Sequence, residues 1–312
     1  MTLKLVGRVS ALALAAALAS SLGACATATE SVPMTPLVPA APATPALAYA
    51  DDIHSNARPA EARVGHVALD LTADFAAKTL SGSATLDVTG RVGATEVVLD
   101  TKNLNIRGVR DAQGRPLRYE LGAADAIKGQ ALTVHLPAFA GTDVQKVVVD
   151  YSTRPDAAAL QWLSPQQTAG GQKPYLFSQG QAILTRTWVP TQDSPGIRQT
   201  YSARVVAPAD LTVVMSAEHL TPQGEAAAAG QKAWRFDMDR PIPPYLMAVA
   251  IGDIAFAPFD ERTGVWTEPS RLEAARAELQ STPRMVDAAE ALYGPYRWGR
   301  YDLLVLPPSF PF

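Results

Sequence analysis

Short apolar runs with a period of two residues fill the sequence from Arg63 to about Asp260. Successive side chains of a strand point to opposite faces of a sheet, so this period predicts strands with one buried face. Gly, Pro, Asn and Asp separate the runs, as in antiparallel strands joined by turns, and we place one such turn at Ser81-Gly82. We therefore expect a mainly β fold, with a large antiparallel β domain over residues 51–255. The expected strands include 67–71, 84–88, 97–100, 131–136, 147–151, 200–206 and 211–215.

The pattern changes near Phe256, where apolar residues begin to recur at helical spacing. Residues 270–280 fit one helix. A second helix follows, for which Thr282 is the expected N-cap, Pro283 lies in the first turn and Gly294 marks the end.

A continuous apolar run from Tyr301 to Leu306 comes next. Such a run is typical of a strand that is covered on both faces. Domains rarely finish on a buried strand and an apolar, proline-rich end. We therefore interpret residues 256–312 as the truncated start of an α/β domain, and the chain as a fragment.

The first 24 residues have the layout of a secretory signal peptide. A basic start precedes an apolar stretch at 11–22, which is too short to span a bilayer comfortably. Leu22-Gly23-Ala24-Cys25 then resembles a bacterial lipobox, so we expect residues 1–24 to be removed and Cys25 to carry lipid. A plain signal peptide cut at a neighbouring Ala-x-Ala site is the alternative. Ala26 resembles the outer-membrane sorting pattern, which predicts a lipid-anchored protein of the cell envelope on the periplasmic side.

Residues 25–50 read as a proline-rich tether. Polyproline II has three residues per turn, so prolines spaced three apart line one edge of a stiff spacer. A ligand for a proline-recognition domain is the alternative, but no basic residue flanks the segment. The prolines are Pro33, Pro36, Pro39, Pro42 and Pro45.

Charge and metal-ligand content exclude several classes of function. Lys and Arg number 27 against 30 Asp and Glu, and this balance argues against nucleic acid as a partner. The single cysteine excludes a disulfide framework and a multi-cysteine zinc site. No histidine has another three to five residues away, so no local metal-binding pair exists. We assign no metal ligand and no catalytic residue to this chain; its histidines are His54, His66, His135 and His219.

Six stretches of the sequence are distinctive: VVLDTKNLNI, ALQWL with the following residues through Ile183, TQDSPGIRQTY, VVMSA, PIPPYLMAVAIG and GPYRWGRYDLLVLPPSFPF. In this order they resemble the amino-terminal part of the zinc aminopeptidase family that includes leukotriene A-4 hydrolase and aminopeptidase N. The resemblance runs from about Ile53 to the last residue. It implies a saddle-like β domain that packs on a thermolysin-like catalytic domain, with a peptide bound between them.

In that family, Gly-Gly-Met-Glu-Asn and then H-E-x-x-H follow the point that Phe312 occupies. These motifs supply the zinc ligands and the general base, and this sequence contains neither of them. The resemblance therefore implies zinc in the full-length enzyme, none bound by this chain, and no hydrolysis by this chain alone. The parent enzyme would remove N-terminal amino acids from peptides.

The resemblance also implies substrate-binding residues at Gln179, Gly180, Gln181, Ala182 and Phe312. The Gln181 amide oxygen would accept a hydrogen bond from the free amine of the peptide. Gly180 and Ala182 would lie along the peptide backbone. Because the family often has a larger residue at Gly180, we expect a roomier cleft wall. Phe312 stands where the leukotriene hydrolases have a tyrosine, and it lacks the hydroxyl.

Two alternatives remain open. Spacing alone also allows Gln179 and Gln181 to face solvent from an edge strand. The whole chain could instead be a non-catalytic, lipid-anchored β module that binds peptides or proteins. For Asp193, before a Ser-Pro pair, we favour a role in a turn or strand corner over a catalytic one.

Overall fold

The computed structural model describes residues 52–310. The predicted signal peptide (1–24), the lipidation at Cys25, the tether (25–50) and the substrate contact of Phe312 lie outside these residues. Within residues 52–310, no helix has both the length and the apolar character that a membrane span requires.

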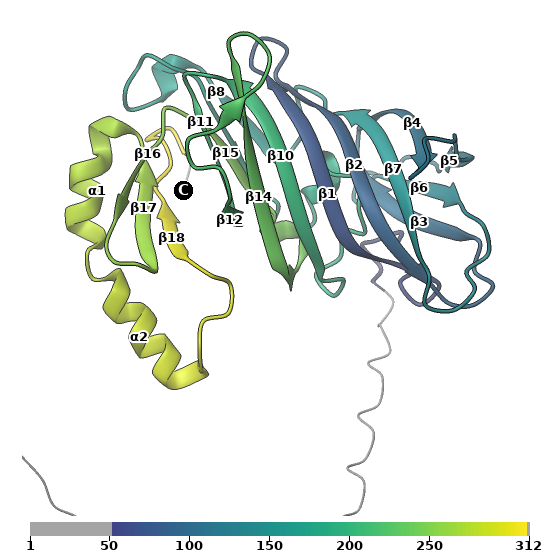
Figure 1. Cartoon of the computed structure of the whole chain (residues 1–312). Coiled ribbons are helices and arrows are strands. Elements are labelled where there is room, and N and C mark those ends of the chain that lie inside the picture. The colour runs from purple at the N-terminus through teal and green to yellow at the C-terminus, as the bar shows by residue number, and fades with distance from the viewer. Residues whose placement is uncertain (1–51, 311–312) are drawn as a thin grey trace, which may run out of the picture. The chain divides into compact units, whose positions relative to one another are not determined.

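An eight-stranded sheet forms the largest layer, with β1 and β10 at its centre (Figure 1). Its neighbouring strands are antiparallel except for the parallel pair β1 and β10. The strand order is β12 (Glu218–His219), β14 (Gln231–Ile242), β10 (Gln199–Pro208), β1 (Ala62–Asp74), β2 (Thr79–Gly90), β7 (Val144–Ser152) and β4 (Asn105–Asp111), with β13 (Glu225–Ala226) beside β14.

Two smaller antiparallel sheets pack against the large sheet. Alternate residues of all three sheets form one apolar core, in which Leu71, Leu99 and Ile251 are almost fully buried. The expected mainly antiparallel β fold is thus confirmed. One small sheet has the order β11 (Thr212–Met215), β15 (Val249–Gly252), β9 (Tyr175–Ser178), β8 (Leu160–Leu163), and the other β3 (Glu96–Thr101), β6 (Gln130–His135), β5 (Tyr119–Leu121).

The expected turn at Ser81-Gly82 is wrong, because both residues lie inside β2. The turn between β1 and β2 comes earlier, at residues 75–78. Gly82 instead lets the backbones of β1 and β2 lie close together. Its φ is +154°, and a Cβ there would lie 1.9 Å from the carbonyl oxygen of Asp70 on β1.

A three-stranded sheet and two helices follow the β sheets just described. β16 (Ala255–Pro258) pairs antiparallel with β17 (Thr263–Thr267), and β17 pairs in parallel with β18 (Tyr301–Leu304). α1 (Leu272–Leu279) and α2 (Thr282–Tyr293) connect β17 to β18, and α1 packs on this sheet (Figure 1). The described chain has four short 3₁₀ turns: η1 (Pro165–Gln167), η2 (Thr185–Thr187), η3 (Pro244–Leu246) and, directly before α1, η4 (Pro269–Arg271).

Both helices are present where the sequence predicts them, but Thr282 is not the N-cap. Ser281 holds that position, and the Thr282 hydroxyl donates to the carbonyl of Leu279, 2.7 Å away. Pro283 does lie in the first turn, and Gly294 follows the helix with a φ of +85°.

β18 is more exposed than the apolar run at 301–306 predicts. Tyr301 is 41% and Leu304 37% exposed, so the expectation of a strand covered on both faces is wrong for these residues. The reason is position, since β18 is an edge strand whose only neighbour among the described strands is β17.

The outer face of the four-stranded sheet carries a second apolar cluster. Tyr175 and Phe177 of β9 are buried there. Trp266, Leu306 and Phe310 pack against them from the three-stranded sheet and the segment after it. The four-stranded sheet is therefore covered on both faces.

A fully buried arginine ties several segments together. Arg186 in η2 donates from Nε to the Asp193 carboxylate at 3.1 Å, and from its two terminal nitrogens to the carbonyls of His54, Lys128 and Asp193. Asp100 lies 3.8 Å from the same guanidinium. Burial raises the pKa of Asp193 to about 6, which leaves the carboxylate ionised at neutral pH. The Asp193 carboxylate is therefore held in a buried ion pair with Arg186, and its expected role in a turn or strand corner stays a prediction.

Candidate functional site

The segment 179–182 follows β9 directly and is held from both sides. The backbone amide of Gln179 donates to the carbonyl of Ala159, and that of Leu184 to the carbonyl of Gly180. The hydroxyl of Ser178, one residue earlier, accepts the amide of Val249 on β15. The peptide bond between Gln181 and Ala182 is cis. A buried strand thus leads into a short segment whose backbone is anchored at both ends.

Gly180 is the buried residue of this segment. A Cβ at this position would lie 2.8 Å from the carbonyl oxygen of Tyr245 and 2.9 Å from the hydroxyl oxygen of Thr185. The space beside the glycine is therefore occupied by η3 and η2. The expectation that Gly180 makes the cleft wall roomier is wrong, because backbone atoms of Tyr245 take up that volume.

Gln179, Gln181 and Ala182 are exposed, in contrast to Gly180. The Gln179 side-chain oxygen accepts the backbone amide of Gln181 at 3.5 Å, a long hydrogen bond. Within residues 52–310, the Gln181 carboxamide itself has no hydrogen-bond partner. Its oxygen and its NH₂ group are therefore free to bind a ligand, with the acceptor and donors that a neutral amide offers.

The structure brings η3 beside Gly180, a contact that the sequence analysis did not predict. Ser216 holds the turn, because its hydroxyl donates to the carbonyl of Leu246 at 2.6 Å and also lies 2.9 Å from the Tyr201 hydroxyl. The Leu246 side chain is 46% exposed. The signal for η3 was present in the stretch PIPPYL, but its contact with Gly180, 65 positions earlier in the chain, becomes visible only in the fold.

Residues 305–310 pack against the same strand that carries the site. The ring of Phe310 meets that of Phe177 edge to face, with centroids 5.3 Å apart. The Ser309 hydroxyl donates to the carbonyl of Gln167 at 2.7 Å. Residues 305–310 thus contact β9, the strand that leads into the segment 179–182.

No metal centre forms among residues 52–310, where no three His, Cys, Asp or Glu side chains come together to hold an ion. His66 contacts the hydroxyls of Thr200 and Ser202, at 2.7 and 3.1 Å. The half-buried His135 lies 3.3 Å from the exposed Glu120. The described residues therefore do not fit a zinc site.

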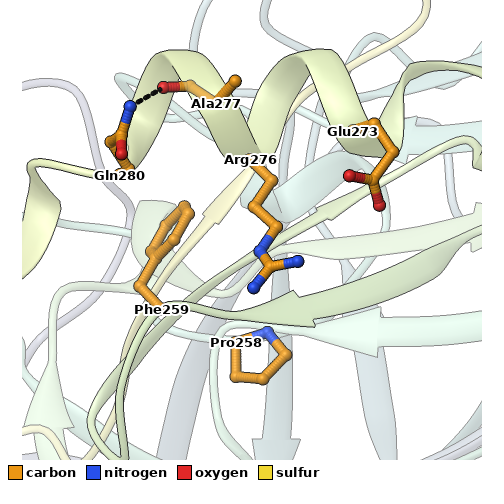
Figure 2. A pocket seen from close by; sticks show the side chains of 6 residues that line it. All are labelled: Pro258, Phe259, Glu273, Arg276, Ala277 and Gln280. Carbon is orange, nitrogen blue, oxygen red and sulfur yellow. Dashed lines mark hydrogen bonds between the residues drawn. The ribbon is translucent and has the colours of Figure 1, made fainter.

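An open groove lies between α1 and β16, apart from the segment 179–182 (Figure 2). Glu273 and Arg276 bring opposite charges to it, and Gln280 donates to the carbonyl of Ala277 at 2.8 Å. Phe259 and Pro258 form its apolar side. These residues include no pair of nucleophile and base, so the groove offers no catalytic chemistry.

Comparison with known proteins identifies the family. The model of the Peptidase M1 N-terminal domain matches residues 62–246. A leukotriene A-4 hydrolase of Xenopus laevis is 39% identical over 264 residues, which cover 84% of this chain and 43% of that protein. A leucine aminopeptidase 2 of Pyricularia oryzae is 36% identical over 79% of this chain and 40% of its own length.

Solved structures agree with these sequence relatives. The yeast LTA4 hydrolase bound to bestatin superposes with a TM-score of 0.75 at 30% identity, over 84% of this chain and 40% of that one. An M1 zinc metallopeptidase of Deinococcus radiodurans shares the fold with a TM-score of 0.64 at 22% identity, over 79% of this chain and 57% of that one. The chain spans about two fifths of the length of the curated relatives it matches. By its sequence and its fold, the chain belongs to the M1 peptidase family and contains the N-terminal domain of that family.

Proposed function

We propose that this chain is the N-terminal part of a membrane-anchored zinc aminopeptidase, and that residues 179–182 form one wall of its peptide-binding cleft. The family membership supports an aminopeptidase as the parent protein. The span of two fifths of the relatives supports a larger parent with a catalytic domain. The α/β unit β17–α1–α2–β18 would be the start of that domain.

The observation that carries the cleft wall is the exposed, unpaired carboxamide of Gln181 beside the buried, anchored Gly180. The N-terminal amine of a peptide is a strong hydrogen-bond donor, and the amide oxygen of Gln181 is a neutral acceptor for it. Because its backbone is held at both ends, the segment is pre-organised and loses little freedom on binding. Gln181 would thereby set the distance between the amine and the bond that is cut.

Zinc would be held by residues of the parent that follow this chain in the sequence. The described residues gather no ligand set, so we derive no step through the metal. The contribution of this chain is to bind and orient the amino end of the peptide. Phe312 would border the same cleft, since residues 305–310 already pack against β9.

Anchoring through a lipid on Cys25, on the periplasmic side of the outer membrane, completes the proposal. The sequence Leu22-Gly23-Ala24-Cys25 supports it. Metabolic labelling with a radioactive fatty acid should mark the wild-type protein in bacterial cells but not the Cys25→Ser variant. Equal labelling of the two would contradict the anchor.

The cleft wall is tested by the kinetics of the full product of the gene on an amino-acyl anilide. Gln181→Ala should lower kcat/KM about 10- to 100-fold, the effect of losing a hydrogen bond to a charged group. Gln223→Ala is the matched control, an exposed glutamine outside the segment 179–182, and should retain kcat/KM within about threefold. If the two variants behave alike, Gln181 does not bind the amine.

A further inference from the structure

His219 in β12 lies within an aromatic cluster where two sheets meet. It pairs with Phe236 of β14, and the two rings stack with centroids 4.6 Å apart. Trp266 of β17 approaches the imidazole from the three-stranded sheet, at 5.9 Å between ring centroids. Both ring nitrogens of His219 are buried without a hydrogen-bond partner in the described structure.

The aromatic contact continues through the three-stranded sheet. Trp266 packs on Phe256 of β16 with centroids 4.5 Å apart, and the guanidinium of Arg300 lies 5.4 Å from the Phe256 ring. The indole nitrogen of Trp266 donates to Asp302 of β18 at 3.4 Å. His219 of the eight-stranded sheet thus contacts the aromatic side chains of the three-stranded sheet through Trp266.

We propose that His219 is a proton-sensitive latch, which holds the three-stranded sheet against the eight-stranded sheet while its imidazole is neutral and loosens that contact when it is protonated. An imidazolium carries two N–H donors and a charge, and a buried charge without a partner is strongly unfavourable. Cation–π attraction from Phe236 and Trp266 offsets only part of that cost.

No charged group of the surrounding elements is placed to stabilise the imidazolium. Glu218 and Asp237 are register partners on β12 and β14, one residue from the stacked rings, so their side chains point to the opposite face. Arg235 lies on that same opposite face, and the residues of β17, Thr263–Thr267, include no ionisable side chain.

The remaining charged pair nearby lies beyond Trp266. Asp302 accepts the indole N–H and is paired with Arg300 at 2.9 Å, so its charge is already neutralised. Burial is accordingly the cause that lowers the pKa of His219 to about 4.

The pH window follows from this shift. A released His219 would titrate near its ordinary pKa of about 6.5. Between pH 4 and 6.5 the released state takes up more protons than the latched state, so the contact weakens as the pH falls through this window. Above pH 6.5 the latch is fully closed. Because Trp266 also covers the sheet that carries β9, release would loosen the packing beside the segment 179–182.

The test uses the complete 312-residue chain, labelled in the imidazole carbons and with 5-fluorotryptophan. An NMR titration from pH 7.5 to 3.5 should give His219 a midpoint of about 4. The fluorine resonance of Trp266, assigned with Trp266→Phe, should shift with the same midpoint. A His219 midpoint at or above about 6, or a Trp266 resonance that does not respond to it, would overturn the proposal.

Variants separate the latch from general acid unfolding. His219→Phe keeps an aromatic ring in the stack and should abolish the Trp266 shift between pH 6.5 and 4. His135→Phe removes a half-buried histidine of another sheet and should leave the shift unchanged. An unchanged shift in His219→Phe would also overturn the proposal. If that variant fails to fold, the wild-type titration remains a complete test.

Discussion

Replacing Arg186 by Met should destabilise the protein far more than replacing a surface arginine. Methionine retains much of the length of the side chain but none of its charge or donors. The carbonyls of His54 and Lys128 would lose their donors, and the carboxylates of Asp193 and Asp100 would remain buried without their cation. Breaking a buried ion pair in this way costs about 3–5 kcal/mol.

That loss should depend on pH. Burial already raises the pKa of Asp193 to about 6, and removal of the guanidinium would raise the pKa further. A carboxyl whose pKa is higher in the folded than in the unfolded protein loses stability as the pH rises from about 4 to its folded pKa. The defect of Arg186→Met should therefore be larger at pH 8 than at pH 5.

The assay is urea denaturation followed by tryptophan fluorescence at both pH values. Arg204→Met is the control, since Arg204 pairs with Asp70 at 2.9 Å on the surface, where both side chains are partly exposed. Such a pair contributes about 0–1 kcal/mol to the free energy of unfolding. If Arg186→Met and Arg204→Met lose the same amount of stability at pH 8, the structural role assigned to Arg186 is wrong.

Three further changes test other parts of the structure. Gly180→Ala should lower the free energy of unfolding by about 1–3 kcal/mol, because the new Cβ meets backbone atoms. Gly108→Ala is the control, since that glycine borders open space, and its free energy of unfolding should stay within about 1 kcal/mol of wild type. Equal thermal stability of the two variants would refute the packing at Gly180. Glu268→Ala removes a buried carboxylate that accepts hydrogen bonds from the backbone amides of residues 169 and 170. The substitution should lower the free energy of unfolding by about 1.5–3 kcal/mol and accelerate hydrogen exchange at both amides. Unchanged protection of these amides would contradict the contact. An NMR titration should give the His66 imidazole a pKa below about 6.5, because burial disfavours its charged form. The stability of the protein should therefore fall as the pH drops below about 6.5. A pKa at the ordinary value would contradict the burial of His66.

Alternation along the chain was sufficient to predict many of the strands, because one buried face per strand leaves a direct signature in the sequence. The prediction from alternation failed where one residue type can have two different structural roles. Gly82 reads as a turn residue, yet its role is to let the backbone of Asp70 approach within a strand pair. The exposure of residues 301–306 could not be predicted either, because the burial of a strand depends on its neighbours in the fold and not on its own residues.

The position of the candidate site stays a prediction, and its environment could not be predicted from the sequence. The family resemblance points to the segment 179–182, in which Gln179, Gln181 and Ala182 are exposed, and their binding role stays a prediction. The contact of Gly180 with Tyr245 joins residues 65 positions apart, and no local pattern indicates it. The partners of Arg186 and of His219 are equally distant in sequence, so their roles emerge only from the fold.

The most direct test of the central claim is the nucleotide sequence of the gene beyond the codon for Phe312. We expect the reading frame to continue into Gly-Gly-Met-Glu-Asn and then H-E-x-x-H, which would supply the zinc ligands that residues 52–310 do not gather. A stop codon directly after Phe312 would contradict the proposed aminopeptidase and would leave a lipid-anchored β module that binds peptides or proteins without cutting them.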